Sequence, residues 1–297
     1  MKVCMADIDE SGLKTAIEKV KTLAADSNDV ISSITDVSVL ESVQALKDTV
    51  YTKWSKVDFL FNNAGIVGGG APTENLERWH KVLQVNLFGV IYGVQVFSKV
   101  STLKTICPQS TIFLLLRLLS KLTLSNKAMI DQGTEAVIVN TGSKQGITFP
   151  PGDCAYNVSK AGVKVVTEGL QHTLRTTPGC KVRALLLVPG WVNTSIALKE
   201  IRRKAGEKFD AKNVPFSEDK PHPGAWMPSQ VVDMLVEAIN ANETNQFYVI
   251  CPDAEMSNEK FNKCIQWTAD DIIKRRPPLA RWSEEHKEEY AQYIKDV

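Results

Sequence analysis

AYNVSKAGVKVVTEGL, residues 155–170, is the stretch from which the rest of this chain is best interpreted. Its pattern predicts a helix, and in a helix Tyr156 and Lys160 lie one turn apart on the same face. A free tyrosine, with a pKa of about 10, is a poor acid or base at neutral pH, and a neighbouring cation that favours the phenolate brings it closer to that range. The pair therefore predicts a proton-transfer centre in which Lys160 lowers the pKa of Tyr156.

Other motifs lie on either side of this helix. In IVNTGSKQG, Ser143 follows a predicted strand, where a hydroxyl can reach a substrate oxygen, although a serine there is more often a turn residue. In VLQVNLFGV, Asn86 lies within a helical pattern and must find hydrogen-bond partners, either in a functional relay or as a satisfied core amide. The remaining motifs are NNAG at 62–65 and LLLVPGWVNT at 185–194.

Together these motifs resemble those of the short-chain dehydrogenase/reductase family, over roughly residues 2–252. The resemblance implies one α/β domain with a doubly wound, Rossmann-like parallel sheet, and an NAD(P)-dependent enzyme that interconverts an alcohol and a ketone or aldehyde by hydride transfer. It implies that Tyr156 exchanges the proton and that Lys160 also holds the nicotinamide ribose. Ser143 would hydrogen-bond the developing alkoxide, and Asn86 would hold a water that links Lys160 to solvent. The substrate stays open within small and medium alcohols and ketones.

The resemblance also places the cofactor. Asp7 ends the first strand, where a carboxylate accepts the ribose hydroxyls and repels a 2′-phosphate, so NAD is preferred and NADP is the alternative. Asp9 competes for this role. A cap or turn is the other interpretation of Asp7, and likewise of Asp36, which would face the adenine. The other expected cofactor contacts are Asn62, Ala64, Gly65, Pro189, Gly190, Val192 and Thr194, together with Tyr156 and Lys160.

Apolar runs alternate with longer helical patterns, which is typical of a parallel sheet flanked by helices. The predicted strands are KVCMADI, DVISSI, VDFLFNN, AVIVNTG, KVRALLLV and QFYVI. The predicted helices lie near 11–24, 38–54, 73–99, 155–177 and 228–241. Gly68-Gly69-Gly70 lacks the spacing of a phosphate loop and is expected to be a mobile loop.

Composition excludes several function classes. Thirty-five basic and 34 acidic residues leave no nucleic-acid footprint. Six scattered cysteines and four dispersed histidines argue for reduced thiols, a cytoplasmic location and no metal site. No secretory signal opens the chain and no apolar run approaches the ~20 residues of a membrane span. The nearest candidate, 111–124, is broken by Arg117 and Lys121 and indicates a buried or interfacial helix rather than an anchor.

Two departures from the family pattern bear on activity. The glycine-rich turn that cradles the pyrophosphate is absent, because the first glycine, Gly12, lies beyond Asp7. A first strand is expected to be missing with it, which would leave the strands at 2–7 and 57–62 without a shared neighbour. Residues 100–127 resemble an insertion, and we hypothesise a retained intron, with a lineage-specific helix as the alternative. The rival to an enzyme is a non-catalytic, truncated or misannotated family member with impaired cofactor binding.

Two later segments complete the expected organisation. The stretch 195–226 matches the family's mobile substrate lid. Beyond the domain at 1–252, residues 253–297 form a C-terminal extension rich in tryptophan and tyrosine. It covers the substrate cleft or a subunit interface, or is a solvated helix pair tied to the surface. Homodimers and homotetramers are common in the family.

Overall fold

The computed structural model describes residues 1–98, 128–208, 210, 221–241, 246–254 and 256–295. The chain forms two compact units, each assembled from several segments. Unit 1 comprises Met1–Ala64, Phe88–Ile138 and His172–Arg183, and unit 2 comprises Gly65–Leu87, Val139–Gln171 and Ala184–Val297. Because the chain crosses between them several times, the units interleave along the sequence.

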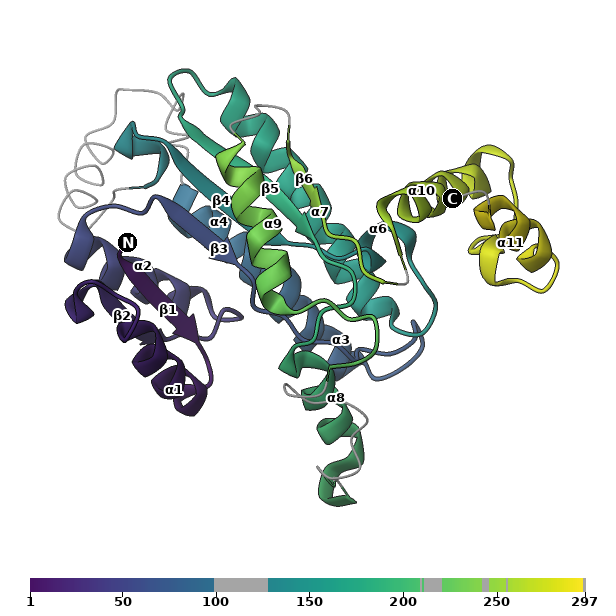
Figure 1. Ribbon diagram of the computed structural model, residues 1–297, viewed down its shortest axis with the longest axis horizontal. Helices are drawn as coiled ribbons and strands as arrows, with labels where there is room; N and C mark the ends of the chain where they lie inside the picture. The colour runs from purple at the N-terminus through teal and green to yellow at the C-terminus, as the bar shows by residue number, and fades with distance from the viewer. Residues whose placement is uncertain (99–127, 209, 211–220, 242–245, 255, 296–297) are drawn as a thin grey trace, which may run out of the picture. The chain divides into compact units, whose positions relative to one another are not determined.

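Unit 1 begins with two parallel strands and the helix that joins them. β1 (Val3–Asp7) pairs with β2 (Val30–Ile34) in register from Val3 opposite Val30 to Asp7 opposite Ile34. Helix α1 (Glu10–Lys21) connects them and packs on both strands (Figure 1). The unit also contains the 3-10 turns η1 (Ser27–Asp29) and η3 (Ile130–Gln132), helices α2 (Leu40–Trp54) and α4 (Gly89–Ser98), and strand β3 (Phe59–Asn62).

The described strands form two sheets rather than one. β1 and β2 make a two-stranded sheet, and β3 belongs to a four-stranded sheet of order β3-β4-β5-β6. In a continuous doubly wound sheet one further strand would lie between β1 and β3. The exposed aromatic rings of β3, Phe59 at 44% and Phe61 at 37%, are what a strand without its usual cover is expected to show. The two sheets agree with the expectation that β1 and β3 lack a shared neighbour, and the missing strand itself stays a prediction.

Strands β4 (Ala136–Thr141) and β5 (Val182–Val188) carry the most deeply buried run of the chain. Their near-continuous apolar sequence suits parallel strands covered on both faces. β5 pairs in parallel with β6 (Tyr248–Ile250), and helix α9 (Pro228–Asn240) lies against β6 (Figure 1). All six predicted strands are confirmed, each within two residues or so of its expected bounds.

The helices of unit 2 place the candidate site. They are α3 (Leu76–Leu83), the π-turn η2 (Gln84–Phe88), α6 (Gln145–Thr148), α7 (Cys154–Thr176), α8 (Ser195–Ala205) and the 3-10 turn η4 (Gly206–Lys208). The helix expected near 73–99 is therefore broken by a π-turn at Asn86, and the other predicted helices are confirmed. The predicted segment at 111–124 and the insertion at 100–127 lie outside the described residues.

The C-terminal extension has a small core of its own. It consists of α10 (Asn258–Ile273), the 3-10 turn η6 (Ala280–Trp282) and α11 (Lys287–Lys295). The Trp267 ring packs edge-on against Tyr290 at 5.2 Å, and the Arg276 guanidinium lies 3.9 Å above Trp267. Arg276 also forms a buried ion pair with Asp271, whose carboxylate accepts from the Ala280 amide. These contacts favour a packed helical unit over a loosely solvated tail.

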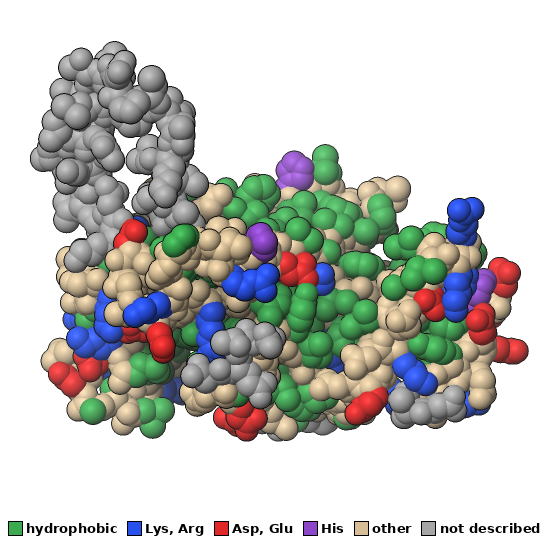
Figure 2. All heavy atoms as spheres, turned by 90° about the horizontal axis from the view of Figure 1, so that it is seen from above, with side chains coloured by type: hydrophobic (Ala, Val, Ile, Leu, Met, Phe, Trp, Pro, Cys, Tyr) green, Lys and Arg blue, Asp and Glu red, His purple; other side chains and the backbone are tan. Residues whose placement is uncertain are grey.

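Charges of both signs are interspersed on the face shown in Figure 2, with apolar side chains between them. None of the described helices is long and apolar enough to cross a membrane. Within the described ranges no cluster of histidine, cysteine or acidic side chains has the makings of a metal site.

Candidate active site

Helix α7 carries Tyr156 and Lys160 on one face, as the sequence predicts. The Lys160 Nζ lies 5.7 Å from the centre of the Tyr156 ring and donates a hydrogen bond of 2.8 Å to the carbonyl of Thr141, the last residue of β4. Lys160 is 4% exposed, and burial lowers its pKa to about 8. Gly146 allows this approach, since a Cβ there would collide with the backbone of Lys160. The ammonium is therefore held beside the end of β4 by helix packing and one backbone carbonyl.

Ser143 and Tyr156 are brought together by the turn after β4. The Ser143 hydroxyl lowers the pKa of Tyr156 and so opposes the largest influence on it. That influence is burial, and with the nearby Asp153 carboxylate it raises the pKa of Tyr156 to about 12. The prediction that Lys160 lowers the pKa of Tyr156 is therefore wrong for these side chains, because burial of the phenol dominates the shift. The tyrosine is nonetheless partly exposed, as a group that reaches a substrate must be.

Asn86 lies at the centre of the π-turn and is fully buried. Its Oδ1 accepts from the Ile66 amide at 2.8 Å, and its Nδ2 donates to the Ile66 carbonyl at 2.9 Å and to Ser159 Oγ at 3.0 Å. Its side chain thus joins the segment after Gly65 to the helix that carries Tyr156. π-turns shift the helical hydrogen bonding by one residue and are frequent at functional sites.

The Gly68–Gly70 segment is tied down, in contrast to the mobile loop expected from its sequence. Its three backbone amides donate to the carboxylate of Asp153, at distances of 2.6 to 3.2 Å, and the same carboxylate accepts from the Tyr156 amide at 3.2 Å. Arg78 donates to the carbonyl of Gly68 and forms an ion pair of 3.5 Å with Glu200 of α8. The sequence offered one cue, an aspartate at the start of α7, which reads as an ordinary helix cap.

Several expected cofactor contacts lie with this centre in unit 2. Thr194 is the N-terminal cap residue of α8, and Val192 bridges in parallel to Trp226. The Pro189 carbonyl accepts from the Lys144 amide at 3.3 Å, so the turns after β4 and β5 are directly joined. The members of this group are Gly65, Pro189, Gly190, Val192 and Thr194.

The residues expected at the adenosine end lie in unit 1. Asp7 ends β1 and accepts from the Asp9 amide at 2.9 Å, whereas Asp9 caps α1 by accepting from the Gly12 amide. Asp9 is thus committed to capping α1, and the role of Asp7 at a ribose stays a prediction. Asp36 accepts from the Ser38 amide and hydroxyl, which is the turn role considered for it. The unit 1 members of the expected set are Asp7, Asp36, Asn62 and Ala64.

The unit 2 residues have the chemistry to hold the nicotinamide end of a dinucleotide. Lys160 uses one ammonium donor on Thr141 and has the chemistry to donate to a ribose, beside the Tyr156 phenol. In unit 1 the start of α1 follows Asp7, beyond the point where the family's glycine-rich turn is expected, and its Asp9 carboxylate cap makes it a poor substitute for that turn. The described residues therefore support proton-transfer chemistry better than tight binding of the nucleotide.

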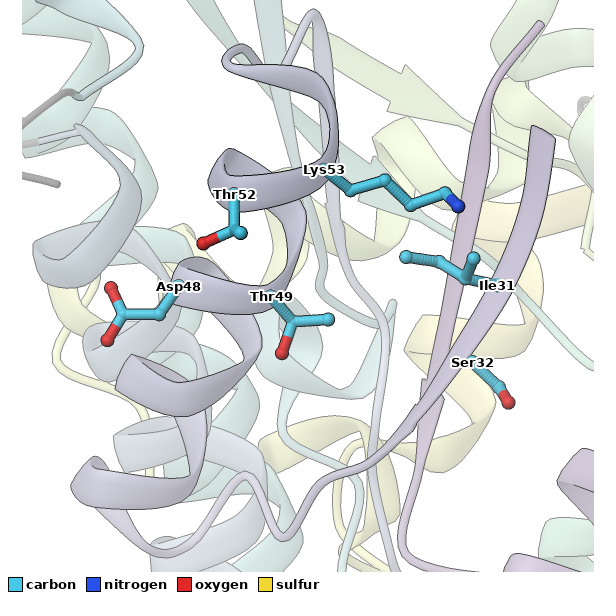
Figure 3. Close-up of a pocket in the computed structure, with 6 residues that line it drawn as sticks. All are labelled: Ile31, Ser32, Asp48, Thr49, Thr52 and Lys53. Atoms are coloured by element: carbon cyan, nitrogen blue, oxygen red, sulfur yellow. The ribbon is translucent and has the colours of Figure 1, made fainter. Parts of the chain in front are cut away.

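A surface hollow in unit 1 is a different kind of feature. It is lined by side chains of β2 and α2, among them Ile31, Ser32, Thr49 and Lys53 (Figure 3). Lys53 and Asp48 are exposed ends of a helix face rather than a pair held for proton transfer. The hollow carries none of the predicted site residues.

Comparison with known proteins identifies the family. The family model described as short chain dehydrogenase matches residues 1–103 and 116–205. The chain belongs to the short-chain dehydrogenase/reductase family. The break in the match, between 103 and 116, falls inside the segment predicted as an insertion, which stays a prediction. Family membership makes the protein an enzyme of the NAD(P)-dependent oxidoreductase type.

Individual relatives agree with this family. A CLA biosynthesis dehydrogenase/reductase of Lactiplantibacillus plantarum is 25% identical over 93% of this chain and 84% of its own, and glucose 1-dehydrogenase 2 of Bacillus subtilis is 26% identical over 77% and 78%. Among solved structures, a Burkholderia phymatum short-chain dehydrogenase/reductase in complex with NAD is 29% identical, with a TM-score of 0.69 over 94% of this chain and 87% of that one. The actinorhodin polyketide ketoreductase with NADPH, 23% identical with a TM-score of 0.57 over 79% of each chain, shares the fold.

Proposed function

We propose that this short-chain dehydrogenase/reductase interconverts a small or medium alcohol and its ketone or aldehyde, with Tyr156 as the acid and base and with NAD preferred to NADP. The observation that carries the proposal is the buried Lys160 ammonium, which lies 5.7 Å from the centre of the Tyr156 ring and donates to the Thr141 carbonyl at the end of β4, one residue before Gly142 and Ser143. Such a cluster can hold a substrate oxygen and move its proton in one place.

In this scheme Tyr156 gives its proton to the substrate oxygen during reduction and takes it back during oxidation. A phenol with a pKa raised to about 12 is protonated at neutral pH and can still donate to an alkoxide, which is a much stronger base. Bound NAD supplies the carbon that exchanges the hydride and, when oxidised, a positive charge that favours the phenolate. In the protein without cofactor, the raised pKa of Tyr156 keeps the phenol protonated and thus favours the reduction direction.

Three other side chains support the proton transfer. Ser143 donates to the developing alkoxide and holds the substrate oxygen near the phenol. Lys160, whose pKa near 8 keeps it charged at neutral pH, binds the nicotinamide ribose with a donor not directed at Thr141. Asn86 uses its side chain on Ile66 and Ser159, so a relay water at this position would be held by backbone groups of the π-turn.

The preference for NAD rests on Asp7. Its position at the end of β1, with Asp9 committed to capping α1, leaves a carboxylate suited to two ribose hydroxyls and hostile to a 2′-phosphate. That a relative of known structure, 29% identical, was solved with NAD is consistent with this choice.

The experiment that tests the function follows the oxidation and reduction of the nicotinamide by absorbance. The substrate panel covers sugars, hydroxysteroids and cyclic ketones, chosen because relatives include a glucose dehydrogenase, a 3beta-hydroxysteroid dehydrogenase and a levodione reductase. Turnover that disappears in Tyr156→Phe and persists in the matched control Tyr92→Phe supports the proposal. Turnover that survives in Tyr156→Phe contradicts it, and NADH binding without turnover on any substrate favours the non-catalytic alternative.

The expected setting of the enzyme follows from the family. We infer a cytoplasmic homodimer or homotetramer whose partners are small alcohol or carbonyl substrates rather than nucleic acids or membranes. Light scattering of the purified chain tests the assembly, and a monomer at micromolar concentration would contradict it.

A further inference from the structure

A buried ion pair joins the catalytic turn to the C-terminal extension. The Lys144 Nζ lies 3.1 Å from Asp253 Oδ2, and the two side chains are only 11% and 7% exposed. These residues are 109 positions apart in the sequence. Lys144 is the immediate neighbour of Ser143, and Asp253 is the first residue of the extension after the last strand and Pro252.

Lys144 directs its ammonium entirely toward the extension in the contacts described. Besides Asp253, it donates to the Met256 carbonyl at 3.0 Å and lies 5.4 Å from the centre of the Phe261 ring. Phe261 is 1% exposed and belongs to the core of α10. Because a lysine loses considerable side-chain entropy when it is fixed in this way, the geometry has to be maintained by all of these contacts together.

Asp253 also binds the turn that follows β5. Its Oδ2 also accepts from the Trp191 amide at 3.1 Å. Gly190 permits this approach, since a Cβ at that position would collide with the same oxygen. A single carboxylate oxygen therefore links the turn after β4, which carries Ser143, to the turn after β5, which carries Gly190.

We propose that Lys144 and Asp253 are positioning residues that fix the Ser143 hydroxyl relative to the Pro189–Trp191 turn, which makes the extension part of the catalytic unit. The proposal rests on the proposed role of Ser143. It resolves the question left by the sequence of whether 253–297 serves the site or is merely attached to the surface. Breaking a buried pair leaves one charge unpaired, and displacement of a catalytic group by about 1 Å can cost on the order of 100-fold in rate.

The test combines Lys144→Met with Ser143→Ala. Lys144→Met is expected to lower kcat by roughly 10- to 100-fold with a smaller change in KM. In the Ser143→Ala background the same substitution is expected to cost less than about threefold, because the group that it positions is gone. Lys144→Arg, which keeps the charge, should recover part of the rate. The matched control, Lys287→Met, breaks an exposed ion pair with Glu284 on the same extension and should leave kcat unchanged.

A second measurement does not depend on turnover. Hydrogen–deuterium exchange of Lys144→Met and of Asp253→Asn, which keeps an acceptor for Trp191, should quicken at the amides of 142–146 and 190–192. If Ser143→Ala itself leaves kcat unchanged, the proposed role of Ser143 fails. Hydrogen–deuterium exchange still tests whether the Lys144–Asp253 pair fixes the two turns. An unchanged kcat and exchange in Asp253→Asn and Lys144→Met, or an equal loss of rate in both Ser143 backgrounds, would overturn the positioning role.

Discussion

Unit 2 and unit 1 differ in how completely their expected sites are built. In unit 2 Lys160 and Asn86 are buried and hydrogen-bonded, and the partly exposed Tyr156 shares a helix with Lys160. In unit 1 the residues for the adenosine end sit beside two strands, β1 and β3, that belong to separate sheets. The difference teaches that a proton-transfer centre needs only local packing around one helix, whereas a dinucleotide site also needs a continuous sheet edge.

The largest expected effect tests whether unit 2 contains the proposed acid and base, Tyr156. Tyr156→Phe removes the exchangeable proton and should lower kcat by about 10³- to 10⁴-fold, with the dissociation constant for NADH changed little. Steady-state rates and a fluorescence titration of NADH measure the two quantities. A mutant that keeps more than a small fraction of the rate would assign the acid to another group.

A pH profile of the reaction rate tests the protonation state of Tyr156 in unit 2. Burial raises the pKa of Tyr156 to about 12, so the phenolate needed for alcohol oxidation is scarce at neutral pH. The oxidation rate should therefore rise with pH, by up to about tenfold per unit while the phenol is protonated, whereas ketone reduction, which uses the protonated form, should stay level. The measurement is initial rates in both directions from pH 6 to about 7.5, where Lys160, with a pKa of about 8, stays charged, at saturating cofactor. Oxidation already independent of pH over this range would show that the phenol is ionised.

A strand and glycine-rich turn added ahead of β1 should narrow the difference between the units. The chain as printed is expected to bind NADH weakly and to aggregate, because β1 and β3 leave backbone groups and apolar surface uncovered. A fusion that places a strand, glycine-rich turn and helix from the NAD-bound Burkholderia phymatum relative ahead of Met1 should tighten NADH binding by roughly 100-fold, the scale of a few backbone hydrogen bonds to an anion. A matched fusion without residues 100–127 separates the effect of that segment. Low-micromolar binding by a monodisperse sample of the chain as printed would refute the expectation.

The smallest expected effect concerns cofactor choice in unit 1. Asp7→Ala should reduce the preference for NADH over NADPH by about tenfold, since ribose hydrogen bonds and phosphate repulsion are both lost. Asp9→Ala is the matched control, because Asp9 caps α1 and its loss should lower stability while the preference stays. The ratio of kcat/KM for the two cofactors decides, and an unaltered ratio in Asp7→Ala moves the assignment elsewhere.

The sequence was sufficient for the fold and for bringing the candidate site residues of α7 and β4 together, because both follow short-range rules. β5 could be predicted from its unbroken apolar run, and Tyr156 and Lys160 from their spacing of one helical turn. Ser143 could be placed because it follows β4 directly. These features depend on local periodicity and on strand ends, which a sequence displays.

Features that depend on burial or on distant pairing were not accessible in this way. The pKa of Tyr156 was expected to be lowered and is raised, because the burial of the phenol is set by tertiary packing. Lys144 reads as a solvated lysine, and nothing in its neighbourhood points to Asp253. Gly68–Gly70 reads as a loose loop, since the carboxylate that binds it lies more than 80 residues away.

The hydrogen bonds from Gly68–Gly70 to Asp153 have a consequence for the choice of substrates. Three amides that converge in this way would ordinarily form a binding site for a phosphate or carboxylate. Here the Asp153 carboxylate already accepts their hydrogen bonds. An acidic or phosphorylated molecule approaching Tyr156 thus meets a negative charge instead of open donors. In a screen, uncharged alcohols and ketones should outperform their phosphorylated counterparts, and a compound pair that differs only in a phosphate would reveal whether this loop sets the charge that the enzyme accepts.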